Sequence, residues 1–333
     1  MRPAVAIVYN EPAAGRYGAV GEARAVLAVL DEVEAVERAL AESEYPTARV
    51  PLRPPLERVR DDISGMKADA VFNLFEGFDD SVGSEAAVAE ILAETGTPFT
   101  GSSGYALRVA VDKMTAGRLL DAAGIATPRC QVLTPATLPS FVLGYPCIVK
   151  PCNEHASHGL SSESVVHDRR SLAEEIVRIS SRYGGEALVE EYLSGREFNA
   201  TVLGNERPAV LPVSEIVYSL PHSLPRLLTF EAKWDPDSVY FKCTQPVCPA
   251  WIDDGLRREM ADMALKAFRV LRCCGYARVD FRLDDHGEPH VLDVNPNPDI
   301  SPCSGVARQA RAAGMQYGEL IAHVLQLALG GSQ

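Results

Sequence analysis

Short apolar runs and longer amphipathic stretches follow one another along the N-terminal part of the chain. An unbroken apolar run predicts a buried strand, and apolar residues three and four positions apart predict a helix with one buried face. We expect strands at residues 5–9 and 69–74 and helices at residues 22–40 and 84–94. Strands that alternate with helices form a mainly parallel sheet covered by helices. Such a sheet binds ligands at the carboxyl ends of its strands, here near residues 10–11 and 73–77.

Beyond residue 102 the pattern becomes mixed. We expect helices at residues 105–123, 171–183 and 254–271 and after Gly318, and strands near Gln131 and Cys147 and at residues 187–189, 199–203 and 209–216. A Pro-rich stretch at residues 221–249 shows the apolar periodicity of neither a helix nor a strand, and we expect it to be a loop over an active site. A chain of 333 residues with this pattern indicates two or three compact domains.

Polar side chains keep one phase along two alternating runs, residues 277–283 and 290–295, that flank a turn rich in Asp, Gly and Pro. We expect an antiparallel hairpin in which Leu283 pairs with His290. This register places two pairs of polar residues on one face: Asp280 across from Asp293, and Arg278 across from Asn295.

Two opposed carboxylates repel each other unless a cation lies between them. Carboxylate and amide oxygens suit Mg²⁺, so Asp280, Asp293 and Asn295 are candidate metal ligands. The alternative is a solvated surface hairpin whose acids have no role. Alternating apolar residues favour the metal site because they give the hairpin a packed face; they are Val279, Phe281, Leu292 and Val294.

The formal net charge is −13, and no Lys/Arg-rich block is present. This charge argues against nucleic acid or an anionic membrane as a partner. The first residues lack the apolar region of a signal peptide and no apolar stretch reaches bilayer length, so we expect a cytoplasmic protein. The eight cysteines include no Cys-x-x-Cys pair, which argues against zinc and favours mostly buried free thiols in a reducing compartment.

Three lysines stand where an anion can meet them. Lys150 ends an apolar strand and precedes a loop of small residues, 152–160, whose backbone amides can cradle phosphate. Lys113 lies on an expected helix, and Lys233 lies in the Pro-rich stretch. Each lysine alone is also explained by simple solvation, as are His155 and His158 in the loop. Convergence of all three on one metal-bound polyphosphate is the better explanation.

Taken in order, these segments resemble an ATP-grasp ligase of the D-alanine:D-alanine ligase branch, from Asn73 onward. The resemblance rests on residues 98–102 (PFTGS), 112–113 (DK), 148–151 (IVKP), 190–198 (EEYLSGREF), 231–234 (EAKW), 278–280 (RVD) and 293–295 (DVN). It implies an α/β (α+β) protein with an ATP-grasp fold. An N-terminal parallel-sheet domain would occupy residues 1–101, and two α+β lobes enclosing ATP would occupy residues 102–190 and 191–333.

The resemblance also implies roles for individual residues. Those that would contact the nucleotide phosphates are Lys113, Lys150, Ser157 and, from a closing loop, Lys233. Those around the adenine and ribose would be Glu190, Glu191, Tyr192, Leu193 and Glu197. Two Mg²⁺ ions, with Mn²⁺ as an alternative, would be held by Asp280, Asp293 and Asn295.

The implied chemistry joins a small-molecule carboxylate to an amine. The carboxylate attacks the γ-phosphate to give an acylphosphate and ADP, and the amine then displaces phosphate through a tetrahedral oxyanion. Arg278 is expected to stabilise that oxyanion, and Ser304 to contact the carboxylate of the second substrate. Trp234 and its loop would exclude water. The resemblance also allows a homodimer.

The chain departs from this branch where the branch binds its amino acids. The Glu, Ser and Tyr that position the first D-alanine are replaced by the segment at residues 9–12 (YNEP), by Ala156 and by Trp234. Asp299 stands where glycine is expected, and Gly305 rather than leucine follows Ser304. We therefore expect a ligase whose substrates are not two D-alanines, with the acceptor near Asp299, Ser301 or Ser304.

Two alternatives remain at this stage. One is a genuine D-alanine:D-alanine ligase that reaches its substrates through Glu11 or Glu76. The other is an ATP-binding protein without catalysis, which the retained metal ligands argue against. Glu11, Glu76 and Glu85 are also explained as ordinary strand-end or helix-face acids.

Overall fold

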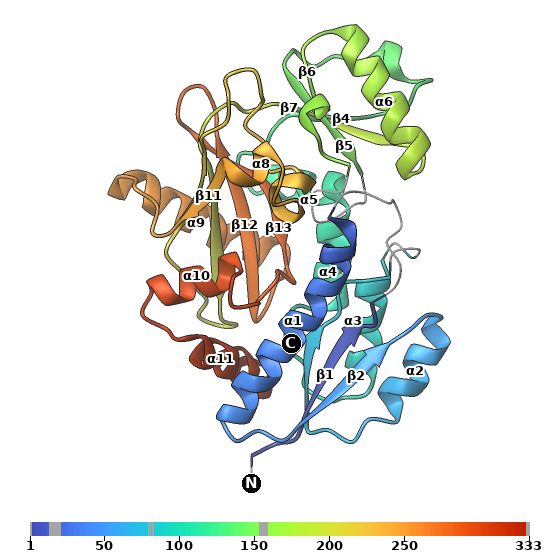
Figure 1. Cartoon of the computed structure of the whole chain (residues 1–333), viewed down its shortest axis with the longest axis vertical. Helices are drawn as coiled ribbons and strands as arrows, with labels where there is room; N and C mark the ends of the chain where they lie inside the picture. The colour runs from blue at the N-terminus through green and yellow to red at the C-terminus, as the bar shows by residue number, and fades with distance from the viewer. Residues whose placement is uncertain (1, 13–20, 79–80, 82, 153–158, 331–333) are drawn as a thin grey trace.

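The chain folds into three β-sheets with helices packed against them, as the computed structural model in Figure 1 shows. The structure describes residues 2–12, 21–78, 81, 83–152 and 159–330. The expected mixed α/β class is confirmed, with one parallel sheet and two largely antiparallel ones. Within the described residues, every helix is either too short or too polar to cross a membrane.

The first sheet is parallel and has the order β2-β1-β3. Its strands and helices are β1 (Val5–Asn10), α1 (Glu22–Glu42), β2 (Thr47–Leu52), α2 (Leu56–Ser64), β3 (Ala70–Leu74) and α3 (Ser84–Glu94). The sequence pattern missed β2 and α2. β2 is an edge strand with only Leu52 buried, so it forms no apolar run, and α2 buries only Val59 and Ile63.

The second sheet is antiparallel and has the order β4-β7-β5-β6. This part of the chain comprises α4 (Gly104–Val111), α5 (Lys113–Ala122), β4 (Cys130–Leu133), η1 (Leu138–Ser140), β5 (Cys147–Pro151), η2 (Ser162–Ser164), β6 (Val165–Val166), α6 (Arg169–Tyr183) and β7 (Ala187–Glu191). Helix α6 packs Leu172 and Ile176 against Val149 and Val189 on one face. Side chains in the alternate phase, including Lys150, point to the other face.

The helix expected at residues 105–123 is two helices. Asp112 (φ −81°, ψ 88°) ends α4 and caps α5, where its carboxylate accepts a hydrogen bond from the amide of Thr115 at 3.0 Å. Asp is a favoured N-cap residue because its side chain satisfies a free amide of the first turn. The break places Lys113 at the first position of α5.

The third sheet has the order β11-β10-β8-β12-β13, with β9 paired to β8. Its strands and helices are β8 (Glu197–Leu203), β9 (Ala209–Val210), β10 (Ser214–Tyr218), α7 (Phe230–Trp234), α8 (Val239–Lys242), β11 (Thr244–Val247), α9 (Asp254–Val270), β12 (Tyr276–Leu283), β13 (Pro289–Asn295), α10 (Gly305–Ala312) and α11 (Tyr317–Leu329). Helix α9 packs Met260 and Phe268 against the apolar phase of β8, β12 and β13. The polar phase of these strands lies on the opposite face.

Residues 221–249 are not the structureless loop that we expected. They contain α7, α8 and the whole edge strand β11. Helices of five and four residues are too short to produce a periodic pattern. We call residues 219–243 the lid, because they leave the sheet after β10 and return at β11, with the amide of Ser219 bonded to the carbonyl of Cys243 at 2.7 Å.

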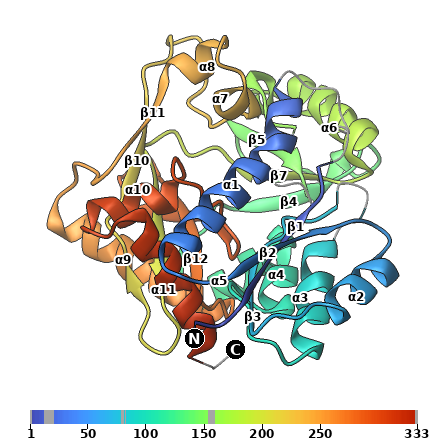
Figure 2. The same ribbon diagram turned by 60° about the horizontal axis from the view of Figure 1, so that its bottom comes forward.

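The N-terminal sheet and the C-terminal helices share one hydrophobic core. Ile7 of β1 and Val33 of α1 belong to the same buried cluster as Leu320 and Leu325 of α11. Figure 2 shows α1 lying between the first sheet and the C-terminal part of the molecule. The last helix therefore completes the core that the first strand begins.

All eight cysteines are free, as expected, but most are not fully buried. Only Cys147 and Cys273 are buried, Cys303 is exposed, and the others are partly exposed. The expectation of mostly buried thiols is wrong because several of these cysteines lie at element ends, as Cys243 does after α8 and Cys152 does after β5.

Candidate active site

The polar faces of β8, β12 and β13 form an ordered array. In the ladders the residues align in three rows, which are Thr201–Arg278–Asn295, Asn199–Asp280–Asp293 and Glu197–Arg282–His290. The expected opposition of Asp280 and Asp293, and of Arg278 and Asn295, is confirmed. Every side chain that a row contributes lies within reach of its neighbours across the strands.

The turn end of the hairpin departs from the expected register. Leu283 pairs with Pro289, and His290 pairs with Arg282, because the register shifts by one residue between Asp280 and Phe281. The extra residue is Leu292, which is only partly buried, and Val291 takes the core position that we expected for Leu292. A bulge of this kind lets the acids and the turn keep different registers.

Arg278 binds Asp280 through both arms of its guanidinium group. Its Nε lies 2.7 Å from Oδ1 of Asp280, and its Nη2 lies 2.8 Å from Oδ2. Burial alone would lower the pKa of Arg278, but the charge of Asp280 and its hydrogen bonds raise it. Arg278 is therefore a permanent cation beside the proposed metal ligands.

The donor set of the hairpin fits a hard divalent ion. Asp280, Asp293 and Asn295 offer only oxygen atoms, which are the ligands that Mg²⁺ prefers. The described residues hold no cluster of three His, Cys, Asp or Glu side chains in a metal-binding arrangement. Two carboxylates and one amide would thus rely on phosphate and water oxygens to complete the coordination of an ion.

Lys150 of the second sheet faces this hairpin. Its Nζ lies 2.5 Å from a carboxylate oxygen of Glu190, and both side chains are largely buried. Burial lowers the pKa of Lys150, but the charges of Glu190 and Asp293 outweigh burial and raise it. Lys150, which we expected at the phosphates, and Glu190, which we expected at the hinge, are therefore a charged pair directed at the polar array.

Lys233 of α7 enters the array from the lid. Burial and the like charge of Arg278 lower the pKa of Lys233 to about 8, although the charges of Asp280, Glu197 and Asp293 oppose this shift. The lid thus places a cation close to the carboxylates of Asp280, Asp293 and Glu197.

Glu197 is held by a network that our reading of the sequence missed. Its Oε2 accepts hydrogen bonds from the hydroxyl of Tyr218 at 2.8 Å and from Nη1 of Arg282 at 3.2 Å. Burial raises the pKa of Glu197, and the charge of Arg282 opposes the shift. Arg282 also bonds the hydroxyl of Tyr192 at 3.3 Å and the carbonyl of Arg226 in the lid. Its only signal in the sequence is that it shares the phase of Arg278 and Asp280.

The expected adenine hinge lies beside an apolar patch. Ile148, Val165 and Leu227 of the lid form a buried cluster against which Tyr192 packs. Glu191 points elsewhere, because its carboxylate binds Nε of Arg129 at 2.9 Å. Leu193 is partly buried. Among the hinge side chains, Tyr192 is the one that the structure brings to both the lid and the array.

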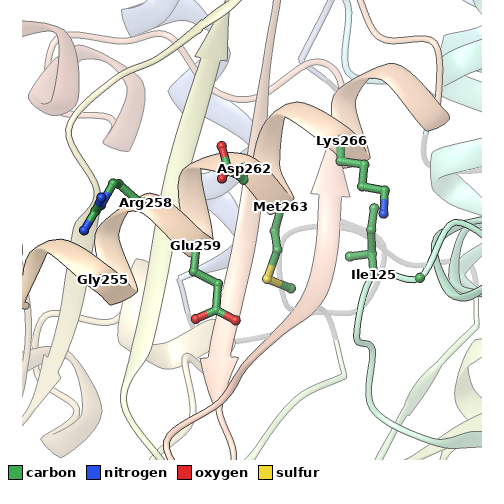
Figure 3. A pocket seen from close by; sticks show the side chains of 8 residues that line it. Ile125, Gly255, Arg258, Glu259, Asp262, Met263 and Lys266 are labelled. Atoms are coloured by element: carbon green, nitrogen blue, oxygen red, sulfur yellow. The ribbon is translucent and has the colours of Figure 1, made fainter.

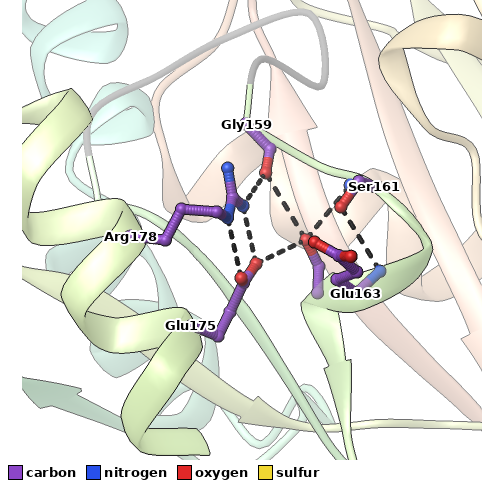
Figure 4. Close-up of polar contacts among 6 residues, drawn as sticks. Gly159, Ser161, Glu163, Glu175 and Arg178 are labelled. Carbon is purple, nitrogen blue, oxygen red and sulfur yellow. Dashed lines mark hydrogen bonds and ion pairs between the residues drawn. The ribbon is translucent and has the colours of Figure 1, made fainter. Parts of the chain in front are cut away.

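Lys113 lies close enough to Cys152 for its charge to oppose the burial that raises the pKa of this thiol to about 11. Ser157, with Ala156, His155 and His158, lies outside the described residues. The described end of their loop is fixed, as Figure 4 shows. Arg178 donates to the carbonyl of Gly159 at 2.6 Å, and Glu175 accepts from Arg178 at 2.6 Å and from Ser164 at 3.0 Å.

Ser304 lies at the N-terminus of α10, and the residue that follows it approaches Arg278. Its Oγ accepts a hydrogen bond from the amide of Ala307 at 3.1 Å, so it caps the helix. A Cβ atom on the following Gly305 would lie 4.0 Å from Cδ of Arg278. Gln309 of α10 ties the helix to the array by bonding the amide of Thr201 at 2.7 Å and the side chain of Asn199 at 2.5 Å.

A group of acids from the first sheet and its helices lies near Asp299. Glu32 is 5% exposed and accepts a hydrogen bond from the amide of Ile300 at 2.7 Å. Burial and the charge of Asp299 raise the pKa of Glu32 well above its ordinary value. Desolvation and Asp299 also raise the pKa of Glu76, although Glu76 keeps access to solvent. Glu32 was missed, yet it shares the buried stripe of α1 with Val29 and Val36.

The other acids that we considered differ in their surroundings. Burial raises the pKa of Glu85 to about 8, and a hydrogen bond from the side-chain Nδ2 of Asn297 at 3.1 Å opposes the shift. Glu11 forms an ion pair with Arg53 near the surface. The acids that approach Asp299 are therefore Glu32 and Glu76, and Glu11 is already paired.

A pocket elsewhere on the molecule has no part in this array. It is lined by Arg258, Glu259, Asp262 and Lys266 of α9 together with Ile125 (Figure 3). Helix α9 covers the apolar face of the third sheet, whereas the array occupies the opposite face.

The fold and the array define an ATP-grasp ligase, and comparison with known proteins places it within that class. A model of the family described as "D-ala D-ala ligase C-terminus" matches residues 119–326. The chain is 32% identical over 271 residues to a D-alanine–D-alanine ligase of Cupriavidus metallidurans, covering 80% of this chain and 78% of the relative. It is also 36% identical over 260 residues to the uncharacterized protein y4sG of Sinorhizobium fredii, covering 78% and 74%.

Solved structures show the same fold. A D-alanine–D-alanine ligase from Bacillus anthracis, complexed with ATP, has a TM-score of 0.76 at 19% identity and covers 99% of this chain and 98% of its own. The VanG D-Ala:D-Ser ligase from Enterococcus faecalis has a TM-score of 0.77 at 19% identity and covers 98% and 100%. The chain belongs to the D-alanine–D-alanine ligase family. It is an ATP-dependent, ADP-forming ligase.

Proposed function

We propose that this protein joins a small carboxylate to an amine through an acylphosphate, and that its substrates are not two D-alanines. The observation that carries the proposal is the convergence of Lys233, Lys150 and Arg278 on the carboxylates of one polar array. Three cations and a metal-binding hairpin in one place suit the transfer of a phosphoryl group.

Different residues of the array and its surroundings would contact different parts of the nucleotide. Lys113, Lys150, Ser157 and Lys233 would contact the phosphates, Glu197 would hold the ribose, and the segment from Glu190 to Leu193 would line the adenine. Asp280, Asp293 and Asn295 would hold two Mg²⁺ ions, or Mn²⁺ in their place, which would neutralise phosphate oxygens. The apolar cluster of Ile148, Val165 and Leu227 beside Tyr192 supports the place of the adenine.

The acyl transfer would take place next to Arg278. A substrate carboxylate attacks the γ-phosphorus, the bond to the bridging oxygen breaks, and ADP leaves. The amine then attacks the acyl carbon, and the resulting oxyanion lies where Arg278 can neutralise it. Collapse of that intermediate expels phosphate, and the amine gives up a proton. Ser304, which lies at the start of α10 and precedes the residue that approaches Arg278, would contact the carboxylate of the second substrate.

The changed substrate site is supported by the acids around Asp299. Glu11 is paired with Arg53, whereas burial and the charge of Asp299 raise the pKa of both Glu32 and Glu76. An ammonium group near Asp299, Ser301 or Ser304 would relieve this repulsion. We propose that the amine substrate binds here, and that it need not be D-alanine.

One alternative has specific support. Several relatives at 32% identity are D-alanine–D-alanine ligases, so the second candidate function is a D-alanine–D-alanine ligase with D-alanine as its sole substrate. A protein that binds ATP without catalysis has no support from the array, because its carboxylates and cations are retained.

The experiment is ADP release with Mg²⁺ and ATP, with Asp293→Ala as the blank. D-alanine alone is tested first, followed by single and paired D- and L-amino acids. We expect turnover only with an unlike pair. Turnover with D-alanine alone would identify a D-alanine–D-alanine ligase instead. No amine-dependent ADP release across the whole panel would contradict the proposed chemistry.

A further inference from the structure

The lid contacts all three parts of the molecule. Leu227 packs on the second sheet with Ile148, and Lys233 enters the polar array of the third. The remaining contact is with the N-terminal unit, where the backbone of Trp234 meets Gly21 at the start of α1. Figure 2 shows α7 next to this end of α1.

Helix α7 carries Lys233 and Trp234 as one rigid piece. Thr229 caps it by accepting a hydrogen bond from the amide of Ala232 at 3.1 Å. Phe230 and Ala232 are buried, and Ser238 bonds the carbonyl of Glu231 at 3.2 Å. A displacement of Trp234 therefore displaces its neighbour Lys233.

Gly21 has no room for a side chain. A Cβ atom at this position would lie 2.6 Å from the carbonyl oxygen of Trp234 and 2.8 Å from its Cβ. Neither atom is the end of a flexible side chain, so a larger residue would push α7 away. On the other side, the carbonyl of Gly21 accepts hydrogen bonds from the amides of Arg24 and Ala25 at 3.0 Å, which fixes Gly21 to α1.

Gly83 serves as a control for Gly21, because it has the same backbone conformation but lacks the contact with the lid. Gly21 begins α1 with φ 87° and ψ −9°, and Gly83 begins α3 with φ 83° and ψ 1°. Both are left-handed, a conformation that favours glycine. A Cβ on Gly83 would meet no atom within 4 Å. Alanine at either site carries the same backbone strain, but only alanine at residue 21 collides with the lid.

We propose that Gly21 is a positioning residue for the ligase reaction: it is the surface on which α7 rests, and this contact holds Lys233 in the array and the lid over the acyl intermediate. The inference rests on the proposed function for its kinetic consequence. The contact itself has a readout that does not require turnover.

The first test compares Gly21→Ala with Gly83→Ala in the full chain. Gly21→Ala should lower kcat by on the order of 10- to 100-fold, because small misplacements of catalytic groups have effects of this size. It should also raise KM for ATP, because the displaced Lys233 is a proposed contact of the nucleotide phosphates. It should also raise the share of ADP that forms without amine, because water reaches the intermediate. Gly83→Ala should match the wild type in all three, and its loss of thermal stability measures the backbone strain that the two variants share.

The second test uses fluorescence. The chain has two tryptophans, and Trp251 is 84% exposed, so Trp251→Phe leaves Trp234 as the sole reporter. The indole nitrogen of Trp234 is buried. In this background, Gly21→Ala should increase quenching of Trp234 by acrylamide, and Gly83→Ala should not.

The outcomes separate the two proposals. Equal kinetic losses in both glycine variants, or unchanged quenching in Gly21→Ala, would overturn the role of Gly21. Absence of turnover in the wild type with every substrate would overturn the proposed function, while the quenching comparison would still decide whether Gly21 supports the lid.

Discussion

Arg282 is a buried cation whose partners come from separate segments of the chain. They are Glu197 in β8, Tyr192 after β7 and the carbonyl of Arg226 in the lid. The guanidinium group also lies 4.9 Å from the centre of the Tyr192 ring. One side chain thus joins the proposed ribose carboxylate to the hinge and to the base of the lid.

Arg282→Met should leave Glu197 buried with Tyr218 as its remaining partner. Removing one member of a buried ion pair costs roughly 3–5 kcal/mol of unfolding free energy, and the pKa of Glu197 should rise further. We expect urea denaturation to show this loss and KM for ATP to increase. Arg257→Met, which removes an exposed pair with Asp254, should cost less than about 1 kcal/mol. Equal losses in the two variants would show that Arg282 has no special role.

Deprotonation of Lys233 should make the rate of the reaction fall at alkaline pH. Its pKa is lowered to about 8, so it carries a charge below this pH and loses it above. If the charge binds the γ-phosphate, kcat/KM for ATP should fall as pH rises through about 8, because kcat/KM reports groups of the free enzyme. Lys233→Arg should remove this fall, although it should also lower the maximal rate. A flat wild-type profile up to pH 9.5 would contradict the assignment.

The lowered pKa of Lys233 should make stability change with pH in the opposite direction to activity. The pKa of Lys233 in the folded chain lies below the ordinary lysine value of 10.5, so folding releases a proton when the pH lies between these two values. Unfolding free energy should therefore rise with pH across this window, while activity falls. Lys233→Met should lose this dependence.

Individual residues were predictable to the extent that neighbours in sequence define them. Asp280, Asp293 and Arg278 follow from the alternation of one hairpin. Arg282 and Glu32 were missed because their roles depend on partners far away in the chain, such as Glu197 and Asp299. Lys113 and Lys233 were picked out as cations that could meet a polyphosphate, but their individual roles came only from the resemblance, since each lies on a helix with no signal of its own.

At the scale of elements, the hairpin of β12 and β13 contains a β-bulge between the acids and the turn. Regular alternation predicted the register at the acids but failed at the turn, because Leu292 is bulged. A bulge is not visible in a pattern of period two. The sequence pattern also failed to predict the strand β2 and the helices α7 and α8. An exposed edge strand and very short helices produce no periodic pattern of apolar residues.

The opposed acids of the hairpin should make Asp293→Asn informative. Without ligand, this variant should unfold at the same temperature as the wild type or higher, because a repulsion with Asp280 is removed. With Mg²⁺ and ADP in excess, the wild type should gain a few degrees by mass action, and the variant should gain much less. Glu288→Gln in the turn of the same hairpin is the control and should behave as the wild type. A full ligand-induced gain in Asp293→Asn would exclude Asp293 as a metal ligand.

At the scale of the whole molecule, the units are joined by shared contacts. The lid touches all of them, and α11 completes the core of the first sheet. The division into residues 1–101, 102–190 and 191–333 remains a proposal. The sequence predicted the sheets but not this sharing, because a buried leucine carries no mark of the sheet against which it packs.

Leu320→Ala in α11 should destabilise the first sheet. Removing a fully buried leucine side chain costs roughly 2–5 kcal/mol, and Leu320 has no exposed surface. We expect faster hydrogen exchange at the amides of β1, although β1 and α11 are at opposite ends of the chain. Leu27→Ala on α1, where the side chain is 52% exposed, is the control and should change little. Unaltered exchange in β1 would show that the two ends do not depend on each other.

The shared core also sets an order of events during synthesis. Ile7 leaves the ribosome before its partners Leu320 and Leu325, which follow the other two sheets along the chain. An apolar face of the N-terminal sheet therefore stays exposed to solvent until the other two sheets and α11 have been translated. During that interval, newly made chains expose an apolar surface that chaperones can bind. A premature stop before α11 would release a protein whose first sheet keeps this apolar face exposed.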